Sequence, residues 1–488
     1  METPGQVAHR SGRASLSGLS DVYRFARSSP TPFYFVSPTP YNILGIDQWI
    51  GAFEYVAYFD SFDGHHPHVF VPRYEGQREF ASFESVNTWL LGHKDVVDRA
   101  RSRGGGKVVF VMFEEETEEL ATEIGLEVAL PARSLREHID SKIVTTQLAN
   151  EAGIPSAPNI LARAESYAEL LDQARAAGLG EDLVVQTPYG DSGRTTFFIS
   201  SEELWDGCAD KLAGEELKIM RRIEHLPGTL EACATRHGTL VGPIQTDLTG
   251  YEELTPYRGG WCGNDLFPGV FDEPTREAIR SLARRLGETL YEHGYRGVFC
   301  VDFLVETGTG EVYLGEINPR VSGASPLTNL ITSKYGGVPL FLFHFLEFMN
   351  VDWEVDLAAV EDRWRQYDEW SQLVLKQTED VTEVIVSAPP SGLWEMRGER
   401  PEFVGPVTTW HTVGHEDEAF YLRVYGAGEY RYKGADLGVI VTRGRMQTDD
   451  RRLTDRARRW AEGITARFSG RAVEELPPVP EPLFTKWF

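Results

Sequence analysis

The sequence predicts a protein of mixed α/β and α+β class with about three domains. The chain has 488 residues, which exceeds the roughly 100–200 residues of a typical single domain. Its composition, with 41% hydrophobic and 25% charged residues, is ordinary for a globular protein. Strands alternate with helices at the start of the chain, and strands paired as hairpins follow. This order indicates a Rossmann-like domain first and α+β domains after it.

The first domain is predicted over residues 31–133, after a flexible tail at 1–30 that has no apolar stretch like a signal peptide's. Its strand candidates are 33–37, 68–72, 107–113 and 126–131. Its helical patterns are 46–58, 83–100 and 114–124. The first strand does not end in a GxGxxG motif, so no dinucleotide site is indicated here.

The second domain is predicted over residues 134–350. Ser134 is a candidate cap for a helix that ends at Gly153, with Pro155 beyond it. The strand candidates, which flank one long helix at 274–294, are 183–187, 218–223, 230–242, 297–305 and 311–318. We expect the segment at about 155–217 to form a mobile lid.

The last third, residues 351–488, is predicted to be an α+β domain. Its strand candidates are 382–388, 419–426 and 437–444, and a basic amphipathic helix is expected at 449–468.

Charge and hydropathy exclude two classes of partner. The formal net charge is −26, from 48 Lys and Arg against 74 Asp and Glu, and a field of that sign repels nucleic-acid backbones. No apolar run reaches the roughly 18 residues of a membrane span. The nearest run, 338–349, is short and contains His344 and Glu347, so it predicts a buried helix. We therefore expect neither a nucleic-acid nor a membrane partner.

The four cysteines indicate a reducing compartment. They are Cys208, Cys233, Cys262 and Cys300. Their spacing matches neither a zinc site nor a disulfide framework. A cytoplasmic location is therefore predicted.

One hairpin, residues 297–326, carries the strongest chemical signal. Glu316 and Asn318 lie two apart in a strand, so their side chains share one face. Asp302 can lie opposite them across a tight turn. This oxygen cluster suits Mg²⁺ bridged to phosphates. Arg320, two residues further on, can neutralise charge on a transferring phosphoryl group.

A glycine-rich turn within VVQTPYGDSGRTTFFI, residues 184–199, is a second candidate element. Backbone N–H groups of Gly190, Ser192 and Gly193 can fold over phosphate oxygens, and Arg194 and Thr195 can add donors. The turn matches no Walker A pattern.

Taken in order, Lys142, this turn, the strand KIMRRIEHLPGTLEA at 218–232 and the hairpin resemble the ATP-grasp superfamily, in its biotin-carboxylase-like branch. The motifs cover roughly residues 135–330. The resemblance implies ATP held between two α+β subdomains and a carboxylate activated as an acyl phosphate. An amine then attacks, and ADP and phosphate leave.

The resemblance also implies roles for individual residues. Lys142 matches the first phosphate-contacting lysine, and Glu231 matches a glutamate of the following strand. The hinge whose backbone recognises adenine matches Met220, Arg221, Arg222 and Ile223. The Mg²⁺ ligands of the family match Asp302, Glu316 and Asn318, and Mn²⁺ can take the place of Mg²⁺ there. The catalytic arginine of the family matches Arg320.

Three positions depart from the family pattern. The second lysine of the family is Gln186 here, so we expect nucleotide affinity to rest on Lys142 and Arg194. Asp302 replaces a more usual glutamate and keeps the metal chemistry. The glutamate that deprotonates bicarbonate in biotin carboxylases falls on Ala324, which cannot act as a base.

The leading hypothesis is therefore an ATP-dependent carboxylate–amine ligase acting on amino acids or small metabolites, as a monomer or homodimer. The alternatives are a carboxylase that forms carboxyphosphate and a degenerate ATP-grasp protein that only binds nucleotide. A long polar loop at 251–270 and the turn after Arg320 supply the substrate-contact candidates, Arg258, Trp261, Asn264, Ser322 and Ser325. Cys262 is disfavoured as a nucleophile.

Overall fold

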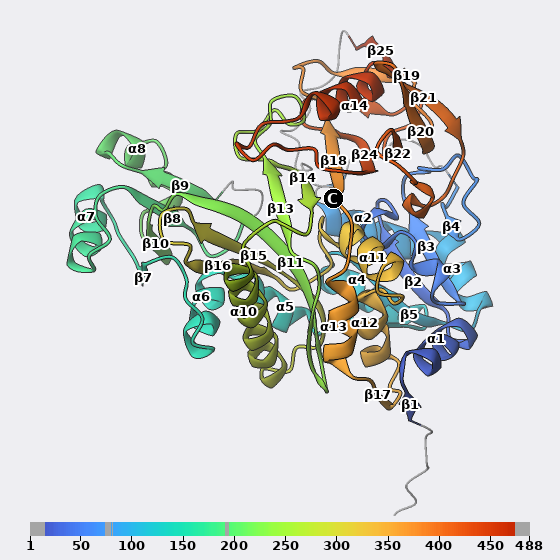
Figure 1. Ribbon diagram of the computed structural model, residues 1–488, viewed down its shortest axis with the longest axis horizontal. Helices are drawn as coiled ribbons and strands as arrows, with labels where there is room; N and C mark the ends of the chain where they lie inside the picture. Colours follow the sequence, from blue (N-terminus) through green and yellow to red (C-terminus); the bar gives the residue numbers. More distant parts are fainter. Residues whose placement is uncertain (1–14, 74–79, 81, 191–194, 474–488) are drawn as a thin grey trace, which may run out of the picture.

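A five-stranded parallel sheet forms the N-terminal part of the computed structural model, which describes residues 15–73, 80, 82–190 and 195–473. Its strand order is β4 (Val69–Phe70), β3 (Phe53–Ala57), β2 (Phe33–Ser37), β5 (Gly106–Val109) and β6 (Leu126–Val128). Its helices are α1 (Leu19–Ser28), α2 (Phe83–Gly92), α3 (Lys94–Ser102) and α4 (Glu115–Glu123). This sheet, blue in Figure 1, confirms the Rossmann-like prediction.

The prediction of a helix at 46–58 is wrong. The chain instead makes two 3₁₀ turns, Tyr41–Ile43 and Ile46–Gln48, and then forms β3. All five residues of β3 are buried, and the strand pairs with β2 on one side and β4 on the other. A short apolar run does not distinguish a buried parallel strand from a buried helix, and pairing on both sides decided for the strand.

Two helices expected to be continuous are each broken once. The pattern at 83–100 divides at His93, whose extended backbone (φ −70°, ψ 130°) separates α2 from α3. The pattern from Ser134 divides at Ser141 into α5 (Arg133–Asp140) and α6 (Lys142–Glu151), and the residue before α5 is Ala132 rather than Ser134. At this break the N–H of Lys142 donates to the carbonyl of Pro188 at 2.8 Å. The break therefore places Lys142 beside the glycine-rich turn.

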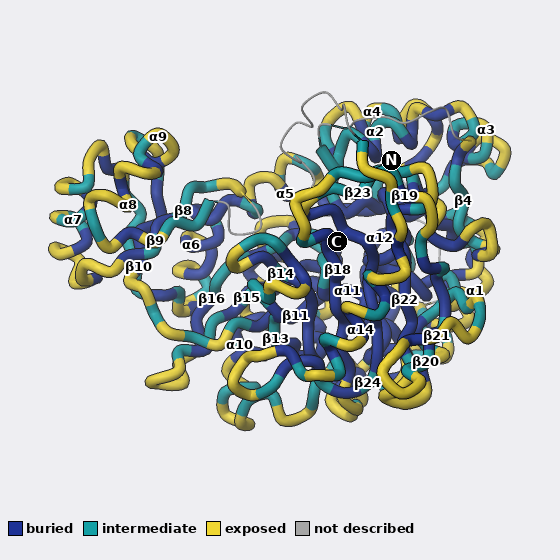
Figure 2. The backbone as a smooth tube through the Cα atoms, turned by 90° about the horizontal axis from the view of Figure 1, so that it is seen from above, coloured by how far each residue is buried: buried dark blue, intermediate teal, exposed yellow. Residues whose placement is uncertain are grey.

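Residues 159–221 form a projecting unit, which we call the lobe (Figures 1 and 2). Its four-stranded antiparallel sheet has the order β7 (Asn159–Ala162), β10 (Leu217–Arg221), β8 (Leu183–Gln186) and β9 (Thr196–Ile199). Its helices are α7 (Tyr167–Ala176), α8 (Glu202–Asp206) and α9 (Ala209–Leu212). The lobe has a small apolar core of its own, with Leu183, Leu217 and Ile219 among its fully buried residues.

An eleven-stranded antiparallel sheet, called the large sheet below, spans the rest of the chain. Its strands in spatial order are β16 (Val312–Asn318), β15 (Gly297–Glu306), β11 (His225–Thr235), β13 (Gln245–Thr249), β14 (Trp261–Leu266), β18 (Trp370–Lys376), β24 (Asp436–Arg443), β22 (Glu418–Arg423), β20 (Gly392–Arg397) and β21 (Arg400–Gly405), with β12 (Gly238–Val241) pairing with β11. The pairing of β14 with β18 carries the sheet across the domain boundary expected at residue 350.

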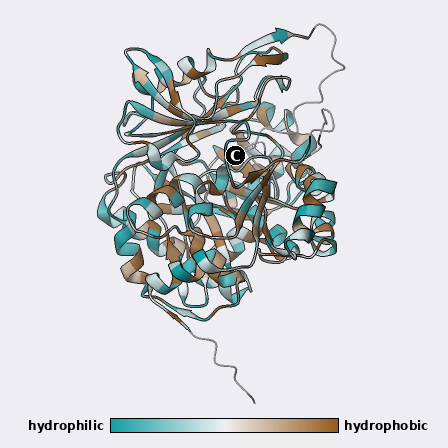
Figure 3. Ribbon diagram, turned by 90° about the vertical axis from the view of Figure 1, so that its right-hand side faces the viewer, coloured by the Kyte–Doolittle hydropathy of each residue, from teal (hydrophilic) through white to brown (hydrophobic). Residues whose placement is uncertain are grey.

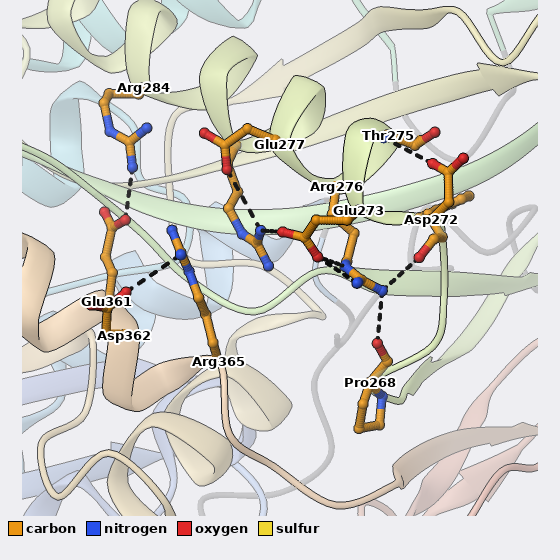
Figure 4. Close-up of polar contacts among 12 residues, drawn as sticks. Pro268, Asp272, Glu273, Thr275, Arg276, Glu277, Arg284, Glu361, Asp362 and Arg365 are labelled. Carbon is orange, nitrogen blue, oxygen red and sulfur yellow. Dashed lines mark hydrogen bonds and ion pairs between the residues drawn. The ribbon is translucent and has the colours of Figure 1, made fainter.

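Helix α10 (Glu273–Glu292), which matches the long helix expected at 274–294, packs on β11 and β12. Asp272 caps it by accepting from the Thr275 N–H at 2.9 Å, and Arg276 pairs with Glu273 (Figure 4). Further along, Arg284 pairs with Glu361 at 2.7 Å. That ion pair joins α10 to α13 (Leu357–Trp364) and so fixes the helix behind the large sheet.

The remaining elements complete the core. They are α11 (Ser325–Lys334), α12 (Phe341–Phe348), α14 (Asp455–Thr465), the 3₁₀ turn Trp410–Thr412, the pair β1 (Leu16–Ser17) with β17 (Trp353–Glu354), and a small sheet of β23 (Tyr430–Arg431), β19 (Glu383–Ser387) and β25 (Ser469–Ala472). All eight residues of α12 are buried, as its sequence predicted. The helices in Figure 3 carry both brown and teal bands, as amphipathic helices do. Among the helices described, none combines the length and apolar character needed to cross a lipid bilayer.

Candidate active site

A row of polar side chains crosses one face of the large sheet. Directly opposed residues of an antiparallel pair point to the same face, as do residues two apart in one strand. The ladder registers therefore align one residue set from β16 to β18: Asn318, Cys300, Asp302, Glu231, Thr229, Gln245, Asp247, Asn264 and Gln372. Sequence analysis identified Asp302, Asn318, Glu231 and Asn264 in this row.

Asp302 lies at the centre of the expected metal site. Its Oδ1 accepts from Thr229 Oγ1 at 2.8 Å, and its Oδ2 accepts from Asn318 Nδ2 at 3.1 Å. Glu316 is its cross-strand partner on β16. Burial and the charge of Asp302 raise the pKa of Asp247. The hairpin thus brings together the three predicted metal ligands.

The donor chemistry of this hairpin fits a hard cation. Among the described residues, no group of three His, Cys, Asp or Glu side chains is arranged to hold a metal ion. The set is instead two carboxylates and one amide, Asp302, Glu316 and Asn318. Mg²⁺ is usually held by one or two carboxylates and completes its shell with water and substrate phosphates. The residues present are therefore suited to Mg²⁺ bound together with a phosphate ligand.

Lys142 joins the large sheet to the lobe. Its Nζ donates to the carbonyl of Gly190 at 2.7 Å and to Glu316 Oε1 at 3.3 Å, and its side chain is only 4% exposed. One ammonium group thus contacts both the glycine-rich turn and a predicted metal ligand.

The glycine-rich turn is only partly described. Gly190 has φ +141°, and a Cβ there would lie 2.1 Å from Thr195 Cγ2, so only glycine fits beside Thr195. Gln186, at the end of β8, donates through Nε2 to Thr196 Oγ1 at 3.0 Å. The other predicted contacts, Ser192, Gly193 and Arg194, lie outside the described residues.

The predicted adenine hinge connects β10 to β11. Met220 is 8% exposed, and Ile223 is half-buried. The N–H groups of Arg221 and Arg222 already donate to the carbonyls of Pro158 and Asp182, at 2.9 and 3.0 Å. The guanidinium of Arg221 contacts Glu306 at 3.3 Å, and that of Arg222 lies over the Phe198 ring. The two arginine side chains therefore fasten the hinge to its neighbours.

Glu231 is a buried residue of β11, beside the start of α11. Ser325 Oγ donates to its Oε1, and Ser322 Oγ does so at 3.4 Å. Burial raises the pKa of Glu231 to about 7, although the hydrogen bonds from Ser325 and Ser322 act in the opposite direction. A carboxyl group of this kind can exchange a proton near neutral pH.

Arg320 follows the end of β16 and donates to Asp140 Oδ1 at 2.7 Å. Its side chain is 13% exposed. Arg136 supports this turn from α5 by donating to the carbonyl of Pro319 at 3.1 Å. The predicted catalytic arginine is thus held in place by α5.

The substrate candidates separate into two groups. Asn264 belongs to the polar row, donating to Asp247 Oδ1 at 2.7 Å and accepting from Gln372 at 2.7 Å. Trp261 packs on Gly323, where a Cβ would lie 2.4 Å from the indole ring. Arg258 is exposed and has no hydrogen bond or ion pair within the described chain.

Sequence reasoning missed several residues of the row, namely Thr229, Gln245, Asp247 and Gln372. Gln372 donates to the Gly323 carbonyl at 2.6 Å and accepts from Tyr41 of the N-terminal part at 2.6 Å. Polar residues two apart in a strand, as in Gln245 and Asp247, are a usable signal. Their neighbours across the sheet are not readable without the strand order.

No protein-family model matches the sequence, and no curated protein sequence matches it. Solved structures do match. The biotin carboxylase domain of Hydrogenobacter thermophilus 2-oxoglutarate carboxylase, solved with MgADP, ADP and bicarbonate, aligns over 85% of this chain and 86% of its own, at 14% identity and a TM-score of 0.57.

Two ribonucleotide synthases show the same likeness. A carboxyaminoimidazole ribonucleotide synthase from Aspergillus clavatus, complexed with ATP, aligns over 85% of this chain and 94% of its own, at 12% identity and a TM-score of 0.52. The Thermotoga maritima N5-carboxyaminoimidazole ribonucleotide synthetase aligns over 91% and 100%, at 13% identity and a TM-score of 0.53. These likenesses confirm the predicted ATP-grasp fold.

Proposed function

We propose that this chain is an ATP-dependent carboxylate–amine ligase that works through an acyl phosphate and releases ADP and phosphate. The main support for this proposal is that the ammonium group of Lys142 contacts both the glycine-rich turn and Glu316. Structures of the same fold contain ATP, ADP or MgADP. The shared fold and the contacts of Lys142 support an ATP site between the lobe and the large sheet.

The proposed reaction divides its tasks among residues of the hairpin and α6. Lys142 binds phosphate oxygens, and Asp302, Glu316 and Asn318 would hold Mg²⁺. That ion, when bound, neutralises charge on the terminal phosphates. Arg320 lies near these residues, with α5 fixing its direction. It stabilises the transferring phosphoryl group and then the oxyanion formed when the amine attacks.

Activation at the terminal phosphate is favoured over a thioester route. A thioester needs an accessible thiolate, and Cys262 is fully buried. Burial raises the pKa of its thiol to about 12, and burial also raises the pKa of the Cys208, Cys233 and Cys300 thiols. An acyl phosphate needs no protein nucleophile.

We place the acid and the amine beside the polar row and the turn after Arg320, which contact each other directly through Gln372 and the Gly323 carbonyl. Asn264, Trp261, Ser322 and Ser325 are the proposed contacts, and Arg258 is the weakest because it is exposed. The lobe would act as the lid, since its separate core allows it to move as a unit. Lid closure would exclude water from the acyl phosphate.

Carboxylation is the second candidate, because a solved neighbour is a biotin carboxylase domain with bicarbonate. Ala324 argues against it: this residue is buried, precedes α11 and offers no base. A protein that only binds nucleotide is the third candidate.

The deciding experiment measures phosphate release from ATP and Mg²⁺ with panels of carboxylic acids, amines and bicarbonate. Release that needs an acid and an amine supports the ligase, release with bicarbonate supports the carboxylase, and none supports the binding protein. Oxygen label should move from the substrate carboxylate into phosphate. Recovery of AMP and pyrophosphate would overturn the proposed path.

A further inference from the structure

Lys218 lies in the middle of the lobe sheet, on the face turned away from the lobe's apolar core. Its strand neighbours Leu217 and Ile219 belong to that core. Because side chains alternate along a strand, Lys218 and Met220 point to the opposite face. Lys218 is nevertheless only 1% exposed. The lysine side chain is therefore almost completely covered on this face, where α6 contacts β10.

Within the described part of the chain, the charged groups that act on Lys218 come from outside the lobe. They are Glu316 on β16 and Lys142 on α6. No described residue accepts a hydrogen bond or ion pair from Lys218 Nζ, whereas Lys142 donates to both Gly190 and Glu316. Lys142 pairs with Glu316, whereas Lys218 feels the charges of both at longer range. Burial lowers the pKa of Lys218 to about 8, with Glu316 opposing this and Lys142 adding to it.

The strand pairing of Lys218 relates it to Gln186, the position where the family has its second lysine. Lys218 on β10 is the direct cross-strand partner of Gln186 on β8. Directly opposed residues have Cβ atoms about 4.5–5.5 Å apart and project from the same face. Gln186 itself donates to Thr196 and brings no charge. A cation that is absent at position 186 is thus present one strand away, beside Lys142.

We propose that Lys218 is the second cation of the nucleotide site and contacts phosphate oxygens of the bound nucleotide. This inference rests on the proposed ATP site. An enclosed ammonium without an acceptor is costly, and a polyanion between Lys142 and Lys218 supplies the missing acceptor. Gln186 then shapes the sheet beside the phosphates and leaves the charge contact to Lys218.

This assignment makes two predictions of opposite sign for Lys218→Met. Binding of ADP with Mg²⁺ should weaken by about 10- to 150-fold, because a charge-assisted hydrogen bond is lost. The melting temperature without nucleotide should rise, because the variant no longer encloses an unpaired charge. Lys211→Met, at an exposed position of α9 in the same lobe, is the matched control and should change neither value.

The exchange variant Gln186→Lys/Lys218→Gln tests position directly. It returns the cation to β8 and should recover most of the lost affinity. Calorimetric titration with ADP and Mg²⁺ measures the affinity of the wild type, Lys218→Met, Lys211→Met and the exchange variant. Thermal melting of each apoprotein measures its stability. Wild-type affinity in Lys218→Met would overturn the inference and leave the ATP site standing. A lower melting temperature in Lys218→Met without recovery in the exchange variant would show a structural lysine and also overturn it. Absence of ADP binding by the wild type would overturn the ATP site itself.

Discussion

The lobe and the large sheet bury polar groups in different ways. In the large sheet, one chain of buried polar side chains is bonded in series from Tyr41 through Gln372 and Asn264 to Asp247. Glu231 Oε2 and Gln245 Oε1, in the same row, have no hydrogen-bond partner within the described chain. In the lobe, Lys218 is buried with no acceptor in the described chain. A satisfied network holds its shape without a ligand, whereas an enclosed charge without an acceptor favours binding of one.

The difference indicates a division of labour between the two sheets. The large sheet offers carboxylates and amides in fixed positions, and the lobe offers a cation. Lys142 is one contact between them, since it bonds to Gly190 on one side and to Glu316 on the other. Arg221 and Glu306 form a second. Four changes test this comparison, in order of decreasing expected effect.

Glu316→Gln attacks the large sheet at its predicted metal ligand. It removes a carboxylate that also pairs with Lys142, so Mg²⁺-dependent turnover should fall by at least about 100-fold. The fold should persist, because Glu316 is partly exposed. Turnover and circular dichroism of the purified variant test this. Retained turnover at ordinary Mg²⁺ would contradict the metal assignment.

The second prediction concerns His344 and the loss of folding stability at acidic pH outside the lobe. It is buried on α12, accepts from the Val298 N–H at 3.1 Å and contacts the Ala129 carbonyl at 2.8 Å. Burial lowers the pKa of this imidazole to about 4, from 6.5. Its contribution to stability is therefore complete above pH 6.5 and is lost as the pH falls toward 4. The full loss is about 3 kcal/mol.

The measurement compares melting temperatures of the wild type and His344→Gln between pH 8 and 4. Above about pH 6.5 the variant should be less stable, and the difference should narrow on acidification. His411, whose pKa burial also lowers to about 4, remains in both proteins and cancels. A difference that stays constant with pH would show that His344 does not titrate on unfolding. The lobe contains no histidine, so no histidine of the lobe contributes to this response.

Lys142→Ala removes the contact through which one ammonium group joins the two sheets. One lost charge-assisted hydrogen bond is worth about 1.5–3 kcal/mol, so ATP affinity should fall by about 10- to 150-fold. Calorimetric titration measures it, with the exposed Lys94→Ala as control. An unchanged dissociation constant for ATP would show that Lys142 has only a structural role.

Gln186→Lys should have the smallest effect. Nucleotide affinity should change by no more than a few-fold, because Lys218 already supplies a cation. A second lysine directly opposite Lys218 should lower apoprotein stability by about 0.2–1 kcal/mol through repulsion. A large gain in affinity would mean that Lys218 does not reach the phosphates.

The sequence by itself determined what is local. Asp302, Glu316 and Asn318 lie within seventeen consecutive residues and one hairpin, so strand alternation alone predicted their shared face. The buried helix α12 was readable from its unbroken apolar run. The same kind of reading failed at 46–58, where pairing on both sides of β3 overrode a helical pattern.

Tertiary structure decided which distant strands became neighbours. Gln245, Asn264 and Gln372 joined the metal hairpin only because β13, β14 and β18 follow β11 in the sheet. Lys218 has an ordinary sequence context, and only the register of β10 against β8 and the packing of α6 on β10 leave this lysine covered. Periodicity along a chain specifies the face on which a side chain lies. Long-range pairing and desolvation specify what that face meets.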